Sequence, residues 1–447
     1  ILSSKMRYFS IISMIISLLP LILTIDCALG LYETPPHIIV FMADDLGWND
    51  VGFHGSNQIP TPNIDALAYN GIILNRHYVL PSSTPSRIAF FTGLYPIRIG
   101  ISCYTHLKTG MQGDGIRGGE PRGLPLHIKI LPEHLRGLGY VTKLIGKWHM
   151  GFHTLQYTPL HRGFDTFFGF YNSHITYYDY EYSNQNMTGY DMHCGDDPAY
   201  GMKREYATDL FTNEAIKIIE NHELPRPLYL QISHLAVHAP IEQPDDSSRD
   251  EIVQIREPNR RKYAKMVSKL DESVGRVVHA LGEKGMLRDS LILFLTDNGA
   301  ASIGRYRNYG SNYPLRGTKY TLYEGGVRGV AALWSSRLEK GARVFKKLIH
   351  ITDWLPTLYS AAGGDLKDLG KIDGIDQWRV LSEGKNCIPK KEKICRYTMG
   401  DCIYFFSALI GKYKLIINGY SKCVDKCLFD IYNDPCETTD LSNEHPE

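Results

Sequence analysis

The sequence has almost no net charge, and it has neither a basic stretch nor an acidic tail. Its 49 lysines and arginines nearly balance 48 aspartates and glutamates, which leaves a formal charge of +1. Proteins that bind nucleic acid through surface charge show a basic excess. The charge balance therefore argues against nucleic acid as a partner. Any selection of charged ligands has to come from local groups of charged residues.

The sequence also lacks internal repeats, low-complexity segments and a cysteine–histidine cluster of the kind that binds zinc. Its 447 residues, 43% of them hydrophobic, can bury a large core, and the length suggests two or more domains. Cys423 and Cys427 have a spacing that could serve a metal, but no matching ligands accompany them. A structural disulfide is therefore the preferred interpretation.

The N-terminal segment has the pattern of a signal peptide. Two basic residues precede an almost wholly apolar stretch at 8–25, and residues 28–30 (Ala-Leu-Gly) resemble a cleavage site. An uncleaved membrane anchor is the alternative, and Pro20 and the small residues favour cleavage. We expect residues 1–30 to be the signal peptide, the mature chain to begin near Leu31, and no stable membrane anchor to remain.

Removal of the signal peptide would also remove Cys27 and leave eight cysteines, an even number. In a secretory chain this predicts disulfides, which we expect among the residues from Cys387 to Cys436. Asn186 begins an Asn-Met-Thr glycosylation sequon in a polar, tyrosine-rich stretch, and it is predicted to carry a glycan. Together these features predict a secreted or lysosomal glycoprotein.

Apolar runs of strand length alternate with helical patterns along most of the chain. Strands are predicted at 37–42, 140–145, 228–233, 291–295 and 330–334, and helices at 62–71, 131–138, 206–221 and 260–281. This alternation predicts an α/β fold with a mixed, mostly parallel sheet covered by helices on both faces.

Past about Gly370 the cysteine density rises, and 412–418 is predicted to be an antiparallel strand. We therefore expect three parts: the signal peptide, a main domain over 31–370, and a small C-terminal α+β domain over 371–447. The chain ends soon after Asp434-Pro435, so we expect this last domain to be truncated.

A short stretch from Leu80 to Gly93 combines hydroxyl residues, a proline and an arginine. Pro85 suits the first turn of a helix, which Ser83 or Thr84 could cap. Ser83 then lies beside a helix N-terminus, where positive charge gathers, and Arg87 follows one turn later. Taken alone, the stretch is a capped and partly buried short helix. It could also bind an anion.

Two acidic pairs follow predicted strands. Asp44-Asp45 comes after the first strand, and Asp297-Asn298 comes after the strand at 291–295. Each aspartate alone is best explained as a turn or cap. Four such oxygens at one edge of a sheet, however, fit Ca²⁺, or less well Mg²⁺.

Cationic residues occupy similar positions in the predicted loops. Arg87, Lys147 and Lys319 suit a tetrahedral anion. His149 and His238 could move protons near neutral pH. Taken singly, a lysine of this kind is more often a surface charge, and a lone histidine is more often packed or facing solvent. His234 is interpreted as a histidine of this kind, either packed or facing solvent.

Several of these motifs together resemble the sulfatase family. The stretch 83–93 is similar to the family signature Cys-x-Pro-x-Arg, which is followed by an apolar run and Thr-Gly. Other motifs are closest to the arylsulfatase B (N-acetylgalactosamine 4-sulfatase) branch: 146–149 (Gly-Lys-Trp-His), 314–319 (Pro-Leu-Arg-Gly-Thr-Lys), 324–329 (Glu-Gly-Gly-Val-Arg-Gly) and 351–357. The resemblance extends from Asp44 to the region of Asp434-Pro435, with the motifs in the same order.

The resemblance implies an alkaline-phosphatase/sulfatase-like fold and a sulfuric ester hydrolase that acts on sulfated sugars, glycosaminoglycans or aryl sulfates. It implies one Ca²⁺ ion, and it implies a formylglycine as the nucleophile. The implied roles are as follows: Asp44, Asp45, Asp297, Asn298 and residue 83 hold Ca²⁺; Arg87 holds residue 83; Lys147 and Lys319 bind sulfate oxygens; His149 assists the aldehyde hydrate; and His238 protonates the leaving alcohol.

The chain departs from the family signature at Ser83, where the formylglycine precursor is cysteine. An aldehyde hydrate has one hydroxyl to attack sulfur and a second to expel sulfate, whereas serine has only the first. Formylglycine is therefore expected at position 83 only if Ser83 is modified. The alternative function is a catalytically weak or inactive relative that binds sulfated glycans. Phosphomonoester hydrolysis is less favoured, because the sequence lacks the expected metal-binding histidines.

Overall fold

The structure is a computed structural model. It describes residues 34–101, 115–116, 118–184, 187–202, 204–245, 252, 254–304, 306–384, 397–398, 406–417, 423 and 425–445. Residues 36–447 belong to one compact unit. The predicted signal peptide, the sequon residue Asn186, and Cys103, Cys387, Cys395 and Cys402 lie outside the described residues.

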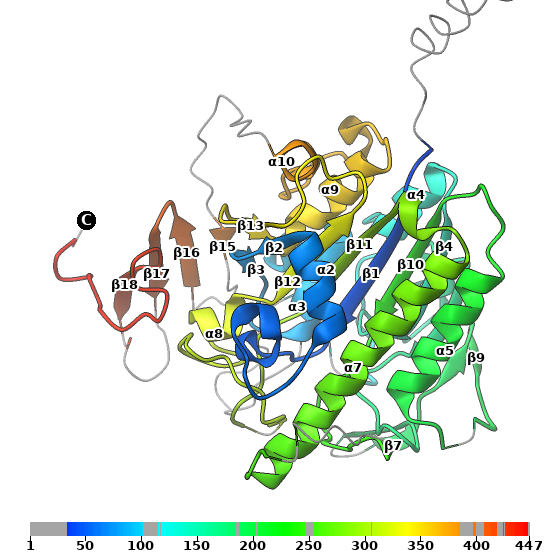
Figure 1. The fold of residues 1–447 in the computed structure, drawn as a ribbon, viewed down its shortest axis with the longest axis horizontal. Helices are drawn as coiled ribbons and strands as arrows, with labels where there is room; N and C mark the ends of the chain where they lie inside the picture. The colour runs from blue at the N-terminus through cyan, green and yellow to red at the C-terminus, as the bar shows by residue number, and fades with distance from the viewer. Residues whose placement is uncertain are drawn as a thin grey trace, which may run out of the picture. The chain divides into compact units, whose positions relative to one another are not determined.

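A ten-stranded mixed sheet forms the centre of the described part of the chain (Figure 1). Its strands, in spatial order, are β13 (Arg343–Phe345), β2 (Ile72–Leu74), β12 (Ala331–Ser335), β11 (Ser290–Thr296), β1 (His37–Ala43), β10 (Leu228–Ser233), β4 (Val141–Lys147), β5 (Thr166–Phe170), β8 (His193–Cys194) and β9 (Asp197–Pro198). The central strands β11, β1, β10, β4 and β5 run parallel, and β12 pairs antiparallel with β11. The predicted fold class is confirmed.

Strand β1 lies at the middle of this sheet because both of its faces are apolar. Ile39 and Phe41 belong to one buried core, and Ile38 and Val40 belong to the other. Alternate side chains of a strand point to opposite faces, and a strand buried on both faces is a nearly continuous hydrophobic run. The polar residues that follow β1 are therefore held at the carboxyl end of the central strand.

Helices cover both faces of the sheet. The first core includes buried residues of α2 (Pro62–Asn70), α5 (Ala207–Glu220) and α7 (Pro258–Glu283), and Figure 1 shows α5 and α7 across that face. The second core includes residues of α3 (Ser83–Thr92), α4 (Leu131–Gly137), α9 (Trp354–Ala361) and α10 (Trp378–Glu383). The predicted helices all form, with ends shifted by a few residues.

The buried face of α5 differs from the one predicted. The apolar spacing predicts that Leu210, Ala215, Ile218 and Ile219 share one face. Ala215 and Ile219 are buried, but Leu210 and Ile218 are only partly buried at the margin of the core. Phe211 and Thr212 are buried instead. Thr212 can be buried because its hydroxyl donates a hydrogen bond to the carbonyl oxygen of Thr208. The spacing of apolar residues along the helix does not predict the burial of Thr212, because threonine is polar and its hydrogen bond is not visible in the sequence.

Smaller sheets complete the fold. They are β3 (His77–Tyr78) with β14 (Ile349–His350), β6 (Glu181–Asn184) with β7 (Met187–Tyr190), and an antiparallel sheet of β15 (Tyr397–Thr398), β16 (Phe406–Ile410), β17 (Tyr413–Ile417) and β18 (Lys426–Asp430). The strand predicted at 412–418 is confirmed as β17. The predicted domain boundary at 370/371 stays a prediction.

The cysteines of the C-terminal segment bear out the disulfide prediction in part. Cys423 and Cys427 form a disulfide with their Cα atoms 5.6 Å apart, which excludes this pair as a metal site. Cys194 and Cys436 carry free thiols. Among the helices of the described residues, none combines the length and the apolar character needed to cross a membrane.

Candidate active site

The two acidic pairs meet at the carboxyl edge of the sheet. Strands β1 and β11 run parallel with Ala43 opposite Thr296, so the residues that follow each strand are neighbours. The amide of Asp45 donates to Oδ1 of Asp297 at 3.2 Å, and Nδ2 of Asn298 donates to Oδ1 of Asp45 at 2.6 Å. Asp45 has φ +61°, a left-handed conformation that aspartate tolerates better than most residues.

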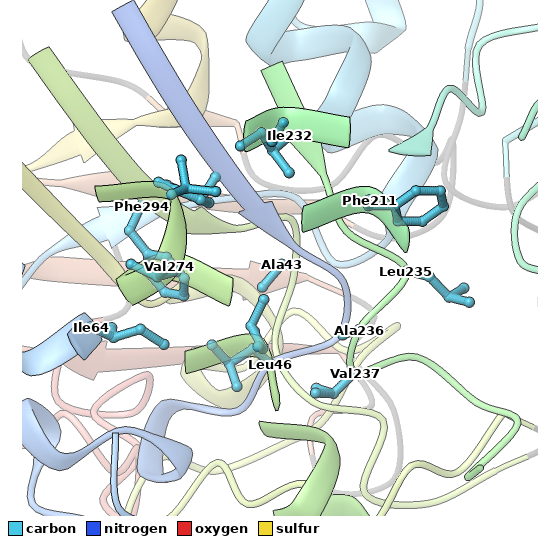
Figure 2. Close-up of a cluster of buried hydrophobic side chains, with 14 of the residues drawn as sticks. Ala43, Leu46, Ile64, Phe211, Ile232, Leu235, Ala236, Val237, Val274 and Phe294 are labelled. Carbon is cyan, nitrogen blue, oxygen red and sulfur yellow. The ribbon is translucent and has the colours of Figure 1, made fainter. Parts of the chain in front are cut away.

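Apolar residues on either side of the polar loops anchor them to the core. Ala43 and Leu46 flank the two aspartates, and the segment 235–237 (Leu-Ala-Val) precedes His238 (Figure 2). All are buried in the first hydrophobic core. The amide of Asp44 donates to the carbonyl oxygen of Ala236. The chain therefore buries apolar side chains immediately beside the polar residues, which anchors the loops that carry them.

Helix α3 brings Ser83 to the same edge. Ser83 is the first residue of the helix, and the N-cap is Ser82, which makes no capping hydrogen bond through its side chain. The prediction that Ser83 or Thr84 caps the helix is wrong, because both hydroxyls have other partners. Ser83 contacts the acidic cluster, and Thr84 Oγ1 lies 3.1 Å from Nε2 of His149. The helix ends as predicted at Gly93, which has φ +65°.

The hydroxyl of Ser83 has three charged partners. It donates to Oδ2 of Asp297 at 2.6 Å. Its oxygen accepts from Nε of Arg87 at 3.0 Å and from Nζ of Lys147 at 2.9 Å. A carboxylate that takes the proton and two cations that face the oxygen are the arrangement that activates a hydroxyl as a nucleophile.

The predicted cations are all buried within this cluster. Lys147 Nζ lies 2.6 Å from Asp44, Arg87 Nη2 lies 2.9 Å from Asp297, and Lys319 Nζ lies 2.8 Å from Asp45. Three cations thus balance three carboxylates. The position before Lys147, within strand β4, requires glycine, because Gly146 has φ +89° and a Cβ there would lie 2.1 Å from the carbonyl oxygen of Ser233.

Three buried polar atoms of this cluster have no hydrogen-bond partner among the described residues: Oδ1 of Asp44, Oδ1 of Asn298 and Nη1 of Arg87. Such atoms are rare in folded proteins and call for an explanation. Two are oxygens of the type that binds hard cations. One candidate ligand atom each from Asp44, Asp45 and His238 also lie within 4.8 Å of one another. The donor set therefore fits a cation beside the two aspartates.

The two predicted histidines both lie beside the cluster, His149 next to Thr84 and His238 next to Asp45. His149 is buried with Nε2 3.2 Å from the carbonyl oxygen of Ile116. Nε2 of His238 lies 3.6 Å from Oδ2 of Asp45. His234 is buried elsewhere, 3.1 Å from the hydroxyl of Ser273, and burial lowers its pKa to about 3. Of the two kinds expected from the sequence, packed or facing solvent, it is the packed kind.

Burial and neighbouring charges shift the pKa values in this cluster. Burial, helped by Lys147 and Arg87, lowers the pKa of His149 well below its ordinary value, so the ring is neutral. Burial also lowers the pKa of Lys147, and Asp44 opposes that effect. For Asp45, burial raises the pKa although Lys319 opposes it.

Several residues beside the site were not singled out from the sequence. Asn308 donates to the carbonyl oxygens of Asp45 and Val237, and so ties two site loops together. The ring of His174 stacks on that of His238 with centroids 5.4 Å apart, and Tyr306 lies 5.7 Å from His238. None of these residues belongs to a motif or follows an apolar strand directly, so only their position in the fold identifies them.

Comparison with known proteins agrees with this geometry. The sulfatase family model matches residues 36–364. The chain belongs to the sulfatase family. The family model match ends before the C-terminal antiparallel sheet.

Three curated relatives of this sulfatase-family chain illustrate its similarity. Arylsulfatase J of Mus musculus is 40% identical over 353 residues, which cover 78% of this chain and 56% of the relative. N-acetylgalactosamine-6-sulfatase of Sus scrofa is 32% identical, covering 85% and 71% of the two chains. Arylsulfatase A of Homo sapiens is 31% identical, covering 85% and 74%. The chain thus spans little more than half the length of arylsulfatase J. The finer resemblance to the arylsulfatase B branch stays a prediction.

Solved structures show the same fold. Ps i-CgsB, crystallised in complex with k-i-k-neocarrahexaose, is 29% identical with a TM-score of 0.78, and the match covers 92% of this chain and 90% of that one. A phosphonate monoester hydrolase of Agrobacterium radiobacter has a TM-score of 0.62 at 17% identity and 92% coverage of both chains. The second likeness concerns the fold alone.

Proposed function

We propose that this chain is a sulfuric ester hydrolase of the arylsulfatase type. The observation that carries the proposal is the hydroxyl of Ser83, which faces a carboxylate and two cations at once. Family membership supports the same chemistry. The roles of Ser83, Arg87, Lys147, His149, His238 and Lys319 as catalytic residues are part of this proposal.

Asp44, Asp45, Asp297, Asn298 and Ser83 would hold one Ca²⁺ ion. The unpartnered oxygens of Asp44 and Asn298 support this assignment. The three carboxylates and three cations of the site sum to zero charge, so a divalent cation would leave a net charge of +2, which would attract the singly charged sulfate ester. Bound there, the ion would draw negative charge from the sulfate oxygens and make sulfur easier to attack.

The side chains support one displacement at sulfur. Oγ of Ser83 attacks sulfur while its proton passes to Asp297, and the bond from sulfur to the alcohol oxygen breaks. His238 supplies the proton that the departing alcohol needs. Lys147 and Lys319 bind the sulfate oxygens. The product is an alcohol and a sulfate ester on Ser83, and release of sulfate from serine then requires attack by water on sulfur.

The attack of water on the sulfur of the serine sulfate is the step that the side chains of the site support least. An aldehyde at position 83, hydrated to two hydroxyls, would let the second hydroxyl expel sulfate, whereas serine has none to spare. We therefore retain a second candidate function, a weak or inactive relative that binds sulfated glycans. The residue type at position 83 favours it, because serine stands where the family signature has the cysteine that precedes formylglycine.

Sulfated carbohydrate is the proposed substrate class. The relatives include N-acetylgalactosamine-6-sulfatases, and the similar Ps i-CgsB was crystallised with k-i-k-neocarrahexaose. Aryl sulfates are the practical assay substrates. We also propose passage through the secretory pathway to the lysosome or the exterior, with a glycan at Asn186. The disulfide between Cys423 and Cys427 supports an oxidising compartment.

Ser83→Cys, made in a eukaryotic secretory host, tests the function. Restoring the family's cysteine should raise turnover of a chromogenic aryl sulfate about a thousandfold, which corresponds to about 4 kcal/mol of barrier. Ser82→Cys is the matched control, because it places a thiol one residue earlier in another buried hydroxyl position and should gain nothing. Mass spectrometry of the peptide with residue 83 reports conversion to formylglycine.

The outcomes separate the two candidate functions. If wild type is slow and Ser83→Cys is fast, the site is a sulfatase site limited by its serine. A wild type as fast as the cysteine variant would remove the inactive-relative alternative. A formylglycine-bearing Ser83→Cys protein that neither turns over aryl sulfates nor binds inorganic sulfate would contradict the proposed function.

A further inference from the structure

A second buried group of charges lies outside the proposed catalytic site, between α8 (Glu324–Val327) and the C-terminal antiparallel sheet. Nζ of Lys414 on β17 lies 2.9 Å from Oε1 of Glu324 and 2.9 Å from Oε1 of Glu437. The amide of Glu324 donates to Oε2 of Glu437 at 2.7 Å. All three side chains are fully buried, so one lysine is shared between two carboxylates away from water.

Apolar contacts surround this joint. Leu409, Ile416 and Phe429 of the C-terminal sheet belong to one buried cluster with Leu322 and Tyr323, which precede α8. Arg316 adds a polar contact, since its Nη1 donates to the carbonyl oxygen of Glu437 at 3.0 Å. The segment 316–324 is therefore held by residues of the C-terminal region at both of its ends.

The same segment carries Lys319. Its side chain reaches Asp45 at 2.8 Å, and its amide donates to the carbonyl oxygen of Ala300 at 3.0 Å. The amide of Tyr320 donates to the carbonyl oxygen of Pro81 at 2.7 Å, two residues before Ser83. The segment thus lies between the proposed catalytic site on one side and the C-terminal sheet on the other.

We propose that Lys414 and Glu437 are positioning residues that hold the Lys319 segment against the site, so that the C-terminal sheet sets the affinity for the sulfate group. The inference rests on the proposed function only where it concerns sulfate. Both residues lie beyond the part of the chain that matches the family model, which ends at residue 364. Neither contacts the site itself, and their effect passes through Glu324 and the backbone of the segment.

Lys414→Met tests the proposal in the full chain, with Lys412→Met as the matched control. Lys412 precedes β17, is partly exposed and pairs with Asp430 across the surface, so the control removes the same charge from the same sheet. We expect Lys414→Met to speed hydrogen exchange at the amides of Lys319 and Tyr320 by about tenfold or more, because local opening then costs less. Inorganic sulfate should bind about tenfold more weakly.

A rescue variant separates positioning from general damage. In Lys414→Met the two carboxylates face each other with one cation, Arg328, 3.4 Å from Glu324. Adding Glu437→Gln removes the excess negative charge while keeping the shape. The double variant should recover exchange rates and sulfate affinity to within about threefold of wild type, because coupled residues are not additive.

Each result decides the proposal. Equal exchange at Lys319 and Tyr320 in the two folded lysine variants would overturn it, as would a double variant no better than the single one. If Lys414→Met does not fold, Arg316→Met carries the test and should loosen the same two amides. A wild type that binds no sulfate would contradict the proposed function, whereas the exchange data would still decide whether the C-terminal sheet holds the segment.

Discussion

Two buried groups of charge in this protein differ in how completely their members are paired. At the carboxyl edge of the main sheet, Asp44 and Asn298 each keep an oxygen without a hydrogen-bond partner among the described residues. At the C-terminal joint, Oε1 of Glu437 also makes no hydrogen bond, but Nζ of Lys414 lies 2.9 Å from it. Glu324 alone is approached by Lys414, Arg328 and the hydroxyl of Tyr78. The unpartnered oxygens of the first group suit a further ligand, as proposed, whereas the charges of the second group pair with one another between two segments of the chain.

The electrostatic environment of the two lysines reflects the same difference. Burial lowers the pKa of Lys147, and the neighbouring Arg87 adds to this because cations crowd the site. Burial also acts on Lys414, but Glu324 and Glu437 outweigh it and raise the pKa above the ordinary value. A crowded cluster of cations suits an incoming anion. The charge of Lys414 is already paired with two carboxylates, so this lysine does not suit an incoming anion.

The largest expected effect comes from removing a ligand of the proposed metal. Asp44→Asn, placed in the Ser83→Cys background, should cut turnover about a thousandfold, or about 4 kcal/mol of barrier. Ca²⁺ at a hundredfold excess over its Kd should stabilise the wild-type chain against unfolding by about 2.7 kcal/mol. Asp44→Asn in the wild-type chain should abolish this stabilisation. Calorimetric titration and thermal unfolding with and without Ca²⁺ measure both.

The control for that experiment is Asp430→Asn, which neutralises a carboxylate paired with Lys412, away from the proposed metal ligands. It should leave the calcium response unchanged. If Asp44→Asn binds Ca²⁺ as tightly as wild type, the proposed metal site is wrong, and the unpartnered oxygens need another explanation.

The next effect is on stability at the C-terminal joint. Glu324→Gln should lower the free energy of unfolding by about 3 kcal/mol or more, because it leaves buried cations without their shared partner. Glu383→Gln removes the same charge from a surface pair with Arg379 and should cost less than about 0.5 kcal/mol. Urea unfolding of both variants checks this. Similar losses in the two would show that the joint is no more than a surface-like contact.

The smallest effect is a pH dependence located at the joint. Burial, helped by Glu324 and opposed by Lys414, raises the pKa of Glu437 from 4.5 to about 7. The folded state then holds this proton more tightly than the unfolded chain. The corresponding stability is present below pH 4.5 and is lost as the pH rises toward about 7, to a limit of about 3 kcal/mol.

Glu437→Gln isolates this contribution. The difference in unfolding free energy between wild type and Glu437→Gln should fall steadily between pH 4.5 and 7.5. Glu324 does not titrate between pH 4.5 and 7.5, because Lys414 and Arg328 outweigh burial and lower its pKa. Parallel pH profiles for the two proteins would mean that Glu437 is ionised throughout, and that both carboxylates of the joint are equally well paired.

Much of the active-site edge could be predicted from short patterns. The apolar strand before Asp44 and the apolar strand before Asp297 are both local features, and parallel strands place their ends at one edge. The helix from Ser83 to Gly93 was also readable, although its capping was not. The hydroxyls of Ser83 and Thr84 were free for other partners because the backbone does not use them as caps.

Sequence alone therefore determined the kind of protein: a mixed α/β sheet with acidic and basic residues at strand ends, and a serine where the family has cysteine. The tertiary structure decided which atoms meet. Asp45 and Lys319 are 274 residues apart, and Lys414 and Glu324 are 90 apart. Local periodicity carries no information about such pairs, because they exist only where packing of the sheet and its helices brings distant loops together and removes the water between them.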